Sequence, residues 1–357
     1  MSKHAAAALG KGWLQPGLAW GGLVLAGLVL IKLVLHLALA GRYSFHGDEL
    51  YFVSCGRRLA WGYVDHPPFV PWLASRFNPL APHDVWPLRI PSAIAGALTV
   101  AGTMLAARRL GGRFWAAFLA GLAVLCAPVY LQMNAMLNIP TFEQVFWVAL
   151  GLLLIQRVQT EDPRWWLAMG VVAGIALLNK HTTLFWGAGV AVGVLATPLR
   201  RDLVTPWPYA GGLLALFIFS PHLVWQAANG WPSVDFVRHL QEDVLANISR
   251  ALFLAGQVLY MNPLSFVLVG AGLWWYFRAP AGRPHRIQAW LFLTLFALLL
   301  VRQGKPYYLA PAYPLLFAAG AVQFERWTRA HTGWRWGYAG ALAGLALVLA
   351  PATLPLL

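Results

Sequence analysis

Apolar runs separated by short polar segments recur along the whole chain. A membrane-spanning helix needs about 20 predominantly apolar residues, and most of these runs approach that length. The runs near 165–179 and 287–301 are short for a full span, whereas the run near 251–277 is long enough to tilt or break. The pattern predicts an all-α membrane protein with about eleven transmembrane helices. We place the runs at about 18–40, 89–107, 114–132, 141–157, 165–179, 182–198, 208–226, 251–277, 287–301, 308–324 and 335–355.

The first run, 18–40, ends in Ala38-Leu39-Ala40, which imitates a signal-peptidase site. The apolar part of a signal peptide is only about 7–15 residues long, so this run is too long and we expect a retained first helix. Composition agrees with a membrane protein, because 59% of the residues are hydrophobic and 11% are charged. Soluble domains carry about 25% charged residues, and a chain with so few cannot cover a water-facing surface.

The formal net charge of +14 raises the question of a nucleic-acid partner. The basic residues form short clusters between apolar runs rather than one polar face, which indicates membrane topology and no nucleic acid. With the N-terminus in the cytoplasm, most of them fall on the cytoplasmic side, as the positive-inside rule requires. This cytoplasmic set is Lys3, Lys11, Arg108, Arg109, Arg113, Arg157, Arg164, Arg200, Arg201, Arg278, Arg283, Arg286, Arg326, Arg329 and Arg335.

Two polar loops on the predicted outer side are long, at 41–88 and 227–250, while the cytoplasmic connections are short. Most of the acidic residues fall in the outer segments. We therefore expect one transmembrane domain over 1–357 with no separate soluble C-terminal domain. In a bacterial plasma membrane, its chemistry would then face the periplasm.

Asp48 and Glu49 follow the first apolar run by about eight residues, and 48–60 has the mixed apolar spacing of a helix lying in the membrane interface. One interpretation is structural, with Asp48 capping a helix and Glu49 favouring its N-terminal dipole. The other is catalytic, because a carboxylate at the membrane surface can act as a general base on a hydroxyl.

His66 precedes Pro67 and Pro68, which enforce an extended segment and remove two N–H donors. A stiff turn leading to a second interfacial helix explains this motif, although His66 beside Asp65 could also line a polar site. Lys180 and His181 interrupt two apolar runs at the outer boundary. A turn there needs only polarity, yet charge near membrane depth is costly and usually functional.

Arg302 and Lys305 flank a glycine in a predicted outer turn, and Tyr307 and Tyr308 lead into the next helix. Snorkelling cations and an aromatic belt explain this pattern. A phosphate headgroup would explain it equally, since lysine offers a point charge and arginine a fork of donors. Glu143, near the outer end of the fourth run, is a further candidate for substrate binding.

Six motifs in a fixed order resemble one known family: DELYF, WGYVDHPPF, RIPSAIAGALTV, LLNKHT, VWQAANGWPSVDF and GKPYYLAPAYP. Together they resemble bacterial glycosyltransferase family 39 of the GT-C superfamily, over about Ser44 to Glu325. This family is related to dolichyl-phosphate-mannose protein mannosyltransferases and to the lipid A aminoarabinose transferase. The resemblance implies a polytopic helical bundle with interfacial helices in the first outer loop.

The resemblance also implies a reaction. Such enzymes move a sugar from a polyprenyl-phosphate carrier to an envelope lipid, glycan or protein, usually with inversion. The catalytic acidic residue of their first outer loop maps onto Asp48, which we expect to act as the general base. Glu49 and His66 would position sugar or acceptor, while Lys180, Arg302 and Lys305 would stabilise the leaving phosphate.

The chain departs from the family pattern in one region. Where many relatives have an aspartate in a short turn after the third helix, this chain reads LNIPTFEQ, with Asn138 and Glu143 instead. That departure keeps open a non-catalytic scaffold with the same fold. The main alternative is of a different class, a lipid-linked solute transporter or flippase without chemistry. No cofactor is predicted. Some relatives use a divalent metal, but Asp48, Glu49 and His66 do not have the spacing of a metal site.

Overall fold

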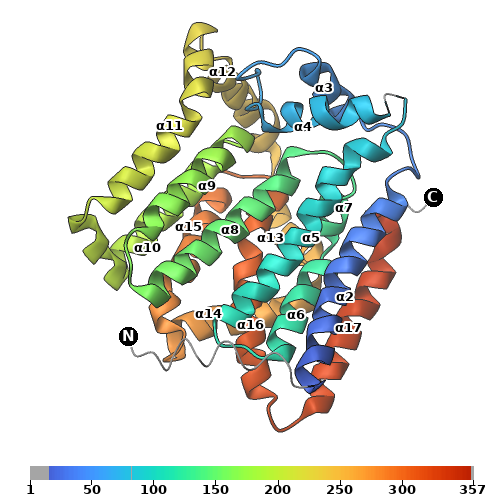
Figure 1. The fold of residues 1–357 in the computed structure, drawn as a ribbon, viewed down its shortest axis with the longest axis vertical. Helices are drawn as coiled ribbons and strands as arrows, with labels where there is room; N and C mark the ends of the chain where they lie inside the picture. The colour runs from blue at the N-terminus through green and yellow to red at the C-terminus, as the bar shows by residue number, and fades with distance from the viewer. Residues whose placement is uncertain (1–15, 82, 355–357) are drawn as a thin grey trace.

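The computed structural model describes residues 16–81 and 83–354, which are helical with turns and contain no strand. The basic residues Lys3 and Lys11 lie outside the described residues. The longer helices run between two ends of one bundle (Figure 1). They are α2 (Pro16–Leu39), α5 (Trp86–Arg109), α6 (Phe114–Leu125), α8 (Ile139–Thr160), α9 (Trp165–Asn179), α10 (Thr183–Leu195), α11 (Trp207–Ala228), α13 (Arg250–Tyr260), α14 (Phe266–Arg278), α15 (Ile287–Val301), α16 (Tyr313–Trp327) and α17 (Thr332–Thr353).

These helices coincide with the predicted apolar runs, but the number of membrane spans is only partly supported. Five of them, α2, α5, α8, α11 and α17, are long and apolar enough to cross a membrane, and two bent pairs would raise the number to seven. The pair α13 and α14 bends by 91° where we expected the run 251–277 to tilt or break, and α10 bends by 103° into the turn that follows it. Helices α6, α9 and α15 are apolar but only 12 to 15 residues long.

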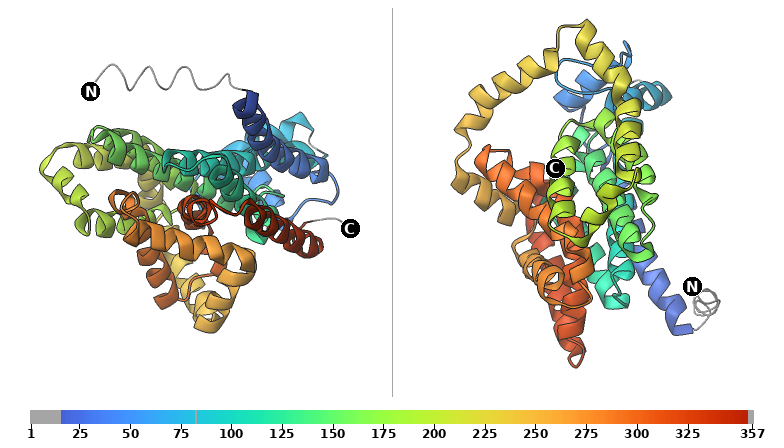
Figure 2. Two further views of the ribbon diagram at one scale, coloured as in Figure 1. Left: turned by 90° about the horizontal axis from the view of Figure 1, so that it is seen from below. Right: turned by 90° about the vertical axis from the view of Figure 1, so that its left-hand side faces the viewer.

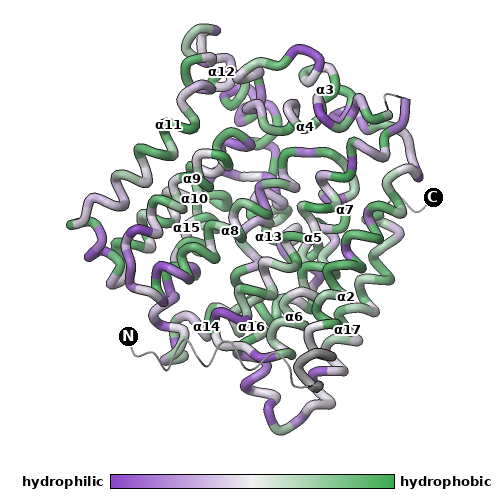
Figure 3. The backbone as a smooth tube through the Cα atoms, in the orientation of Figure 1, coloured by the Kyte–Doolittle hydropathy of each residue, from purple (hydrophilic) through white to green (hydrophobic). Residues whose placement is uncertain are grey.

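Polar residues gather at the two ends of the bundle and apolar residues along its length (Figure 3). At one end, which we call the α3 end, lie α3 (Gly47–Gly56), α4 (Phe69–Phe77) and α12 (Pro232–His239) (Figures 1 and 2). Helices α3 and α4 lie in the first long loop, where two interfacial helices are expected. The connections α5–α6, α8–α9, α14–α15 and α16–α17 lie at the opposite end, and the arginines of the predicted cytoplasmic set lie in or beside these and the α10–α11 connection.

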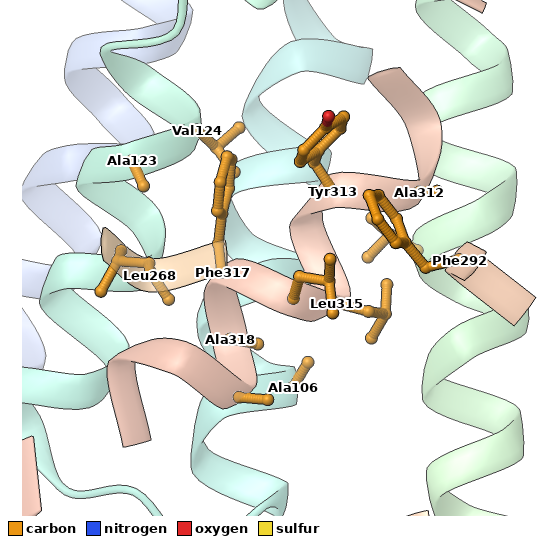
Figure 4. Close-up of a cluster of buried hydrophobic side chains, with 14 of the residues drawn as sticks. Ala106, Ala123, Val124, Leu268, Phe292, Ala312, Tyr313, Leu315, Phe317 and Ala318 are labelled. Atoms are coloured by element: carbon orange, nitrogen blue, oxygen red, sulfur yellow. The ribbon is translucent and has the colours of Figure 1, made fainter. Parts of the chain in front are cut away.

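Helix α16 occupies the centre of the bundle. Its side chains Tyr313, Leu315 and Phe317 meet apolar residues from α5, α6, α14 and α15 (Figure 4). Backbones approach closely where α14 crosses α16. A Cβ atom on Gly320 would lie 1.9 Å from the Leu268 carbonyl oxygen, so only glycine fits there. Small residues give this close packing in membranes, where the lipid tails are as apolar as the side chains.

The third predicted run, 114–132, is not one continuous helix. It breaks at Cys126 and Ala127 into α6 and the short α7 (Pro128–Met133). The fully buried Lys32 of α2 donates to the Tyr130 carbonyl oxygen at 2.8 Å, and a ring nitrogen of His36 lies 3.1 Å from the Leu131 carbonyl oxygen. Lys32 and His36 are four residues apart and lie on one face of α2. Their two side chains therefore join α2 to the backbone near the break.

Candidate active site at the α3 end

Helix α3 begins with a capping box, and Asp48 is not its cap. The His46 side chain accepts from the Asp48 backbone N–H, and the Glu49 carboxylate accepts from the His46 N–H at 2.9 Å. The cap interpretation of Asp48 is therefore wrong in detail, because His46 and Glu49 form both capping bonds. The Asp48 side chain is 66% exposed, and one of its carboxylate oxygens lies 3.9 Å from His46 Nδ1.

Glu49 lies at the centre of a buried hydrogen-bond network. Arg89 of α5 holds both of its oxygens, at 2.9 Å and 2.7 Å, and the Leu137 backbone N–H donates to it at 3.0 Å. The same guanidinium donates to the carbonyl oxygens of Ala40 at 2.7 Å, Tyr43 at 3.2 Å and Ser44 at 2.9 Å. The Glu49 carboxylate has no exposed surface and several donors, so its contacts give it a positioning role.

A second buried carboxylate faces the same end of the bundle from α8. Glu143 is 1% exposed and pairs with the Lys180 ammonium at 2.7 Å, while the Thr182 hydroxyl donates to its other oxygen. Lys180 lies in the turn between α9 and α10 and stands 4.7 Å from the centre of the Tyr308 ring. The structure thus joins Glu143, Lys180 and Tyr308, three residues singled out separately in the sequence.

Tyr307 connects this group to Asp48. Burial and the adjacent Tyr308 raise the pKa of the Tyr307 phenol above its ordinary value. The negative charges of Glu143 and Asp48 raise that pKa further, so both carboxylates lie near one phenol. The charges of Asp48 in α3 and Glu143 in α8 therefore both act on Tyr307 at the α3 end.

His66 lies in an aromatic cage rather than open to solvent. Its ring is 1% exposed and lies 4.9–5.4 Å from the rings of Tyr51, Phe52 and Tyr63. Burial lowers its pKa, and its Nε2 has no hydrogen-bond partner among the described residues. The ring Nδ1 lies 2.8 Å from the Pro67 carbonyl oxygen, so the His-Pro-Pro segment is both a stiff turn and a buried polar position.

His181 pairs with a histidine that the sequence analysis did not single out. Its Nε2 lies 2.9 Å from Nε2 of His222 in α11, whose Nδ1 lies 2.8 Å from the Trp61 carbonyl oxygen. Burial, His222 and His66 lower the pKa of His181 to about 4. His222 could have been found as a single ionisable residue inside an apolar run, which is by default a functional candidate. Arg89 gave a comparable signal as an arginine in the first turn of an apolar run.

Arg302 and Lys305 lie beside the site but are not bound into it. Arg302 is exposed and Lys305 is partly buried, and neither makes an ion pair within the described part of the chain. Lys305 caps the short helix that begins at Pro306 and holds Tyr307 and Tyr308. Among residues 16–81 and 83–354, no group of three or more His, Cys, Asp or Glu side chains is placed to hold a metal ion.

Comparison with known families gives one partial match. Residues 65–225 match the family described as Dolichyl-phosphate-mannose-protein mannosyltransferase. The chain is 24% identical over 275 residues to Lipid A galacturonosyltransferase RgtD of Rhizobium johnstonii, which covers 72% of this chain and 55% of the relative. An uncharacterized protein of Aquifex aeolicus is also 24% identical, over 71% of this chain and 52% of that protein. The chain thus spans about half the length of these relatives.

Solved structures share the fold. ArnT from Cupriavidus metallidurans bound to undecaprenyl phosphate superposes with a TM-score of 0.74 at 22% identity, covering 94% of this chain and 65% of that one. The Archaeoglobus fulgidus oligosaccharyltransferase superposes with a TM-score of 0.60 at 14% identity, over 96% of this chain and 55% of the other. In sequence and in fold, the chain is therefore similar to membrane glycosyltransferases.

Proposed function

We propose that this protein transfers a sugar from a polyprenyl-phosphate carrier to a hydroxyl of an envelope lipid or glycan at the α3 end. The observation that carries the proposal is the contrast between three carboxylates. Glu49 and Glu143 are buried and paired with Arg89 and Lys180, whereas Asp48 is exposed and forms no ion pair with a lysine or arginine within the described residues. Asp48 is therefore the carboxylate at this site that is free to accept a proton from a substrate.

The proposed reaction is a single displacement with inversion. The acceptor hydroxyl oxygen attacks the anomeric carbon as the bond from that carbon to the phosphate oxygen breaks. The bonding electron pair leaves with the phosphate, and the hydroxyl proton passes to Asp48 as general base. Lys180, Arg302 and Lys305 lie nearby and would stabilise the negative charge that develops on the leaving phosphate.

The remaining site residues would hold this arrangement in place. Glu49 fixes the start of α3, and thereby Asp48, through Arg89. Glu143 holds Lys180 against the Tyr308 ring, where it would bind sugar or phosphate. His66 is buried within the first long loop, and His181 reaches that loop through His222, whose Nδ1 lies 2.8 Å from the Trp61 carbonyl oxygen. Both histidines would act on substrate by holding this loop.

Two names among the similar proteins support the substrate classes. One solved neighbour binds undecaprenyl phosphate, and the curated relative is a lipid A galacturonosyltransferase. We propose a bacterial plasma-membrane location with the α3 end at the periplasm, because the arginine-rich connections lie at the opposite end and cytoplasmic loops are enriched in Lys and Arg. The proposed chemistry uses side chains alone and includes no cofactor.

The test is Asp48→Asn in membranes supplied with radiolabelled polyprenyl-phosphate sugars and an envelope lipid extract. We expect the transfer rate to fall by about 100- to 10,000-fold, the usual contribution of a positioned general base, with the protein still inserted. Asp235→Asn, at an exposed aspartate of the same end, is the control and should keep its rate. Full transfer by Asp48→Asn would disprove the assignment. Carrier movement without any product in the wild type would support a flippase instead.

A further inference from the structure

A cavity of about 710 Å³ lies at the end of the bundle opposite Asp48. It is formed by Gly21 and Val24 of α2, the first turn of α6, the last turn of α16 and the start of α17. Four arginines and one glutamate line it, together with aromatic side chains. The charged lining residues are Arg113, Arg326, Arg329, Arg335 and Glu325.

The single carboxylate of the lining does not neutralise these arginines. Both oxygens of Glu325 are occupied by backbone N–H groups at the start of α6, those of Arg113 at 2.7 Å and Ala116 at 3.1 Å. Its charge therefore faces the positive end of a helix dipole. Within the described residues, none of the four guanidinium groups forms an ion pair with a carboxylate.

One of the four arginines is built into the wall. Arg335 is 9% exposed, and its guanidinium donates to the Thr328 hydroxyl at 3.0 Å and to the Glu325 carbonyl oxygen at 2.9 Å. These bonds use Nε and Nη2, so Nη1 remains for another acceptor. Arg113, Arg326 and Arg329 are exposed around it, and the Arg326 guanidinium stands beside Gly111 in the α5–α6 turn.

The other walls suit an amphipathic ligand. Trp115 and Trp336 meet edge to face with their centroids 4.7 Å apart, and the Arg335 guanidinium lies 6.0 Å from the Trp115 ring. Trp336 is 60% exposed, as is typical of tryptophans at a membrane–water interface. Helices α2 and α17, which flank the cavity, bury only 17% of their most apolar segments within the protein, so most of this apolar surface lies on the outside of the bundle.

We propose that this cavity binds the phosphate headgroup of an anionic phospholipid from the adjoining leaflet. Unpaired guanidinium groups bind phosphate oxygens through charge-assisted hydrogen bonds. Basic pockets between membrane helices on the cytoplasmic side commonly hold such headgroups. The outer apolar surfaces of α2 and α17 provide a path for acyl chains, which a soluble anion would not need. The site is separate from the transfer chemistry proposed at the α3 end.

A second cavity shows the contrast. It lies beside α17 and is lined by His331, Trp334, Gly337 and Tyr338 among others, with no arginine. If the cavities were simply gaps between apolar helices, both would have the same mainly apolar lining. The concentration of arginine in the first cavity is what selects a phosphate there.

The experiment uses the full chain purified in a neutral detergent and native mass spectrometry with phosphatidylglycerol or phosphatidylcholine. The wild type should retain phosphatidylglycerol in preference to phosphatidylcholine. The double variant Arg326→Gln/Arg329→Gln should bind phosphatidylglycerol roughly tenfold more weakly, because each basic residue near an anionic headgroup adds a several-fold gain in binding. Both positions are exposed, so folding should be unaffected.

The matched control is Arg278→Gln/Arg283→Gln, which removes the same charge from exposed positions at the same end but outside the cavity. It should keep the affinity within about twofold. Equal losses in the two double variants would overturn the proposal, since they would indicate a general charge effect. Displacement of the lipid by an equal concentration of glycerophosphoglycerol, the same headgroup without acyl chains, would also overturn it in favour of a soluble anion.

Discussion

Two groups of charged residues, one at each end of the bundle, differ in their pairing. At the α3 end, the buried carboxylates Glu49 and Glu143 each have a cation within 2.7 Å. At the opposite end, Arg157 and Asp202 form another buried pair, but the four arginines around the cavity have no carboxylate partner in the described structure. Buried paired charge holds loops in place, because leaving either partner alone in a dry interior is costly. Unpaired charge at a surface remains available to a ligand, as it does at Asp48.

The strongest test of this contrast removes the partner of the most buried carboxylate. Arg89→Met would leave Glu49 without a countercharge, and we expect the free energy of unfolding to fall by about 3–5 kcal/mol. Denaturant titration of the purified protein measures this change. Arg89→Met/Glu49→Gln should recover part of the loss, because no uncompensated charge remains. A single variant as stable as the wild type would show that Glu49 does not depend on this ion pair.

The second test asks whether Glu143 and Lys180 act on the transfer reaction as one unit. Lys180→Met should lower the transfer rate by roughly 10- to 100-fold, since it removes a cation proposed to stabilise the leaving phosphate. Glu143→Gln should lower it by a similar factor by releasing Lys180 from the Tyr308 ring. The double variant should be little worse than either single one, because contacting residues are not additive. Multiplied losses would mean that the two residues act independently.

A third, smaller effect concerns pH at the histidine pair. The pKa of His181 is lowered from 6.5 to about 4 in the folded protein, chiefly by burial. The unfolded chain therefore binds more protons than the folded one below pH 6.5, so stability falls as pH falls from about 6.5 to 4. Thermal unfolding midpoints between pH 7.5 and 4.5 should decline less for His181→Gln than for the wild type. Parallel curves would exclude His181 as the source.

The smallest effect is expected at the exposed ion pair of α12. Arg238 and Asp235 are 71% and 60% exposed and lie 3.4 Å apart. Surface pairs of this kind contribute little, so Arg238→Ala should change the free energy of unfolding by less than about 0.5 kcal/mol. The same denaturant titration as for Arg89 provides the comparison. A loss similar to that of Arg89→Met would remove the distinction between buried and exposed pairs.

Local pattern was sufficient to predict the helices. Apolar length located α5, α8 and α11 within a few residues, and the excess length of the run 251–277 anticipated its bend. It did not anticipate the break at Cys126, because α6 and α7 have continuous apolar sequence. Nor did it provide the number of full spans, since several apolar helices are too short to cross a membrane alone.

The candidate site was predicted as a set of residue types but not as a set of partners. Asp48, Glu143, Lys180 and Tyr307 each stood out locally, yet their proximity depends on how four helices pack. Glu49 and Arg89 are 40 residues apart in the chain, so no local sequence pattern predicts that they pair. For the same reason, two adjacent acidic residues with similar sequence surroundings have opposite exposure in the structure.

The bond between Glu49 and Arg89 also constrains how the protein is made. Glu49 leaves the ribosome 40 residues before Arg89, which at roughly 5–20 residues per second is a delay of about 2–8 seconds. During that time the first loop has no countercharge for its buried carboxylate and cannot adopt its final shape. The loop that carries Asp48 therefore completes its folding only after Arg89 at the start of α5 has been synthesised.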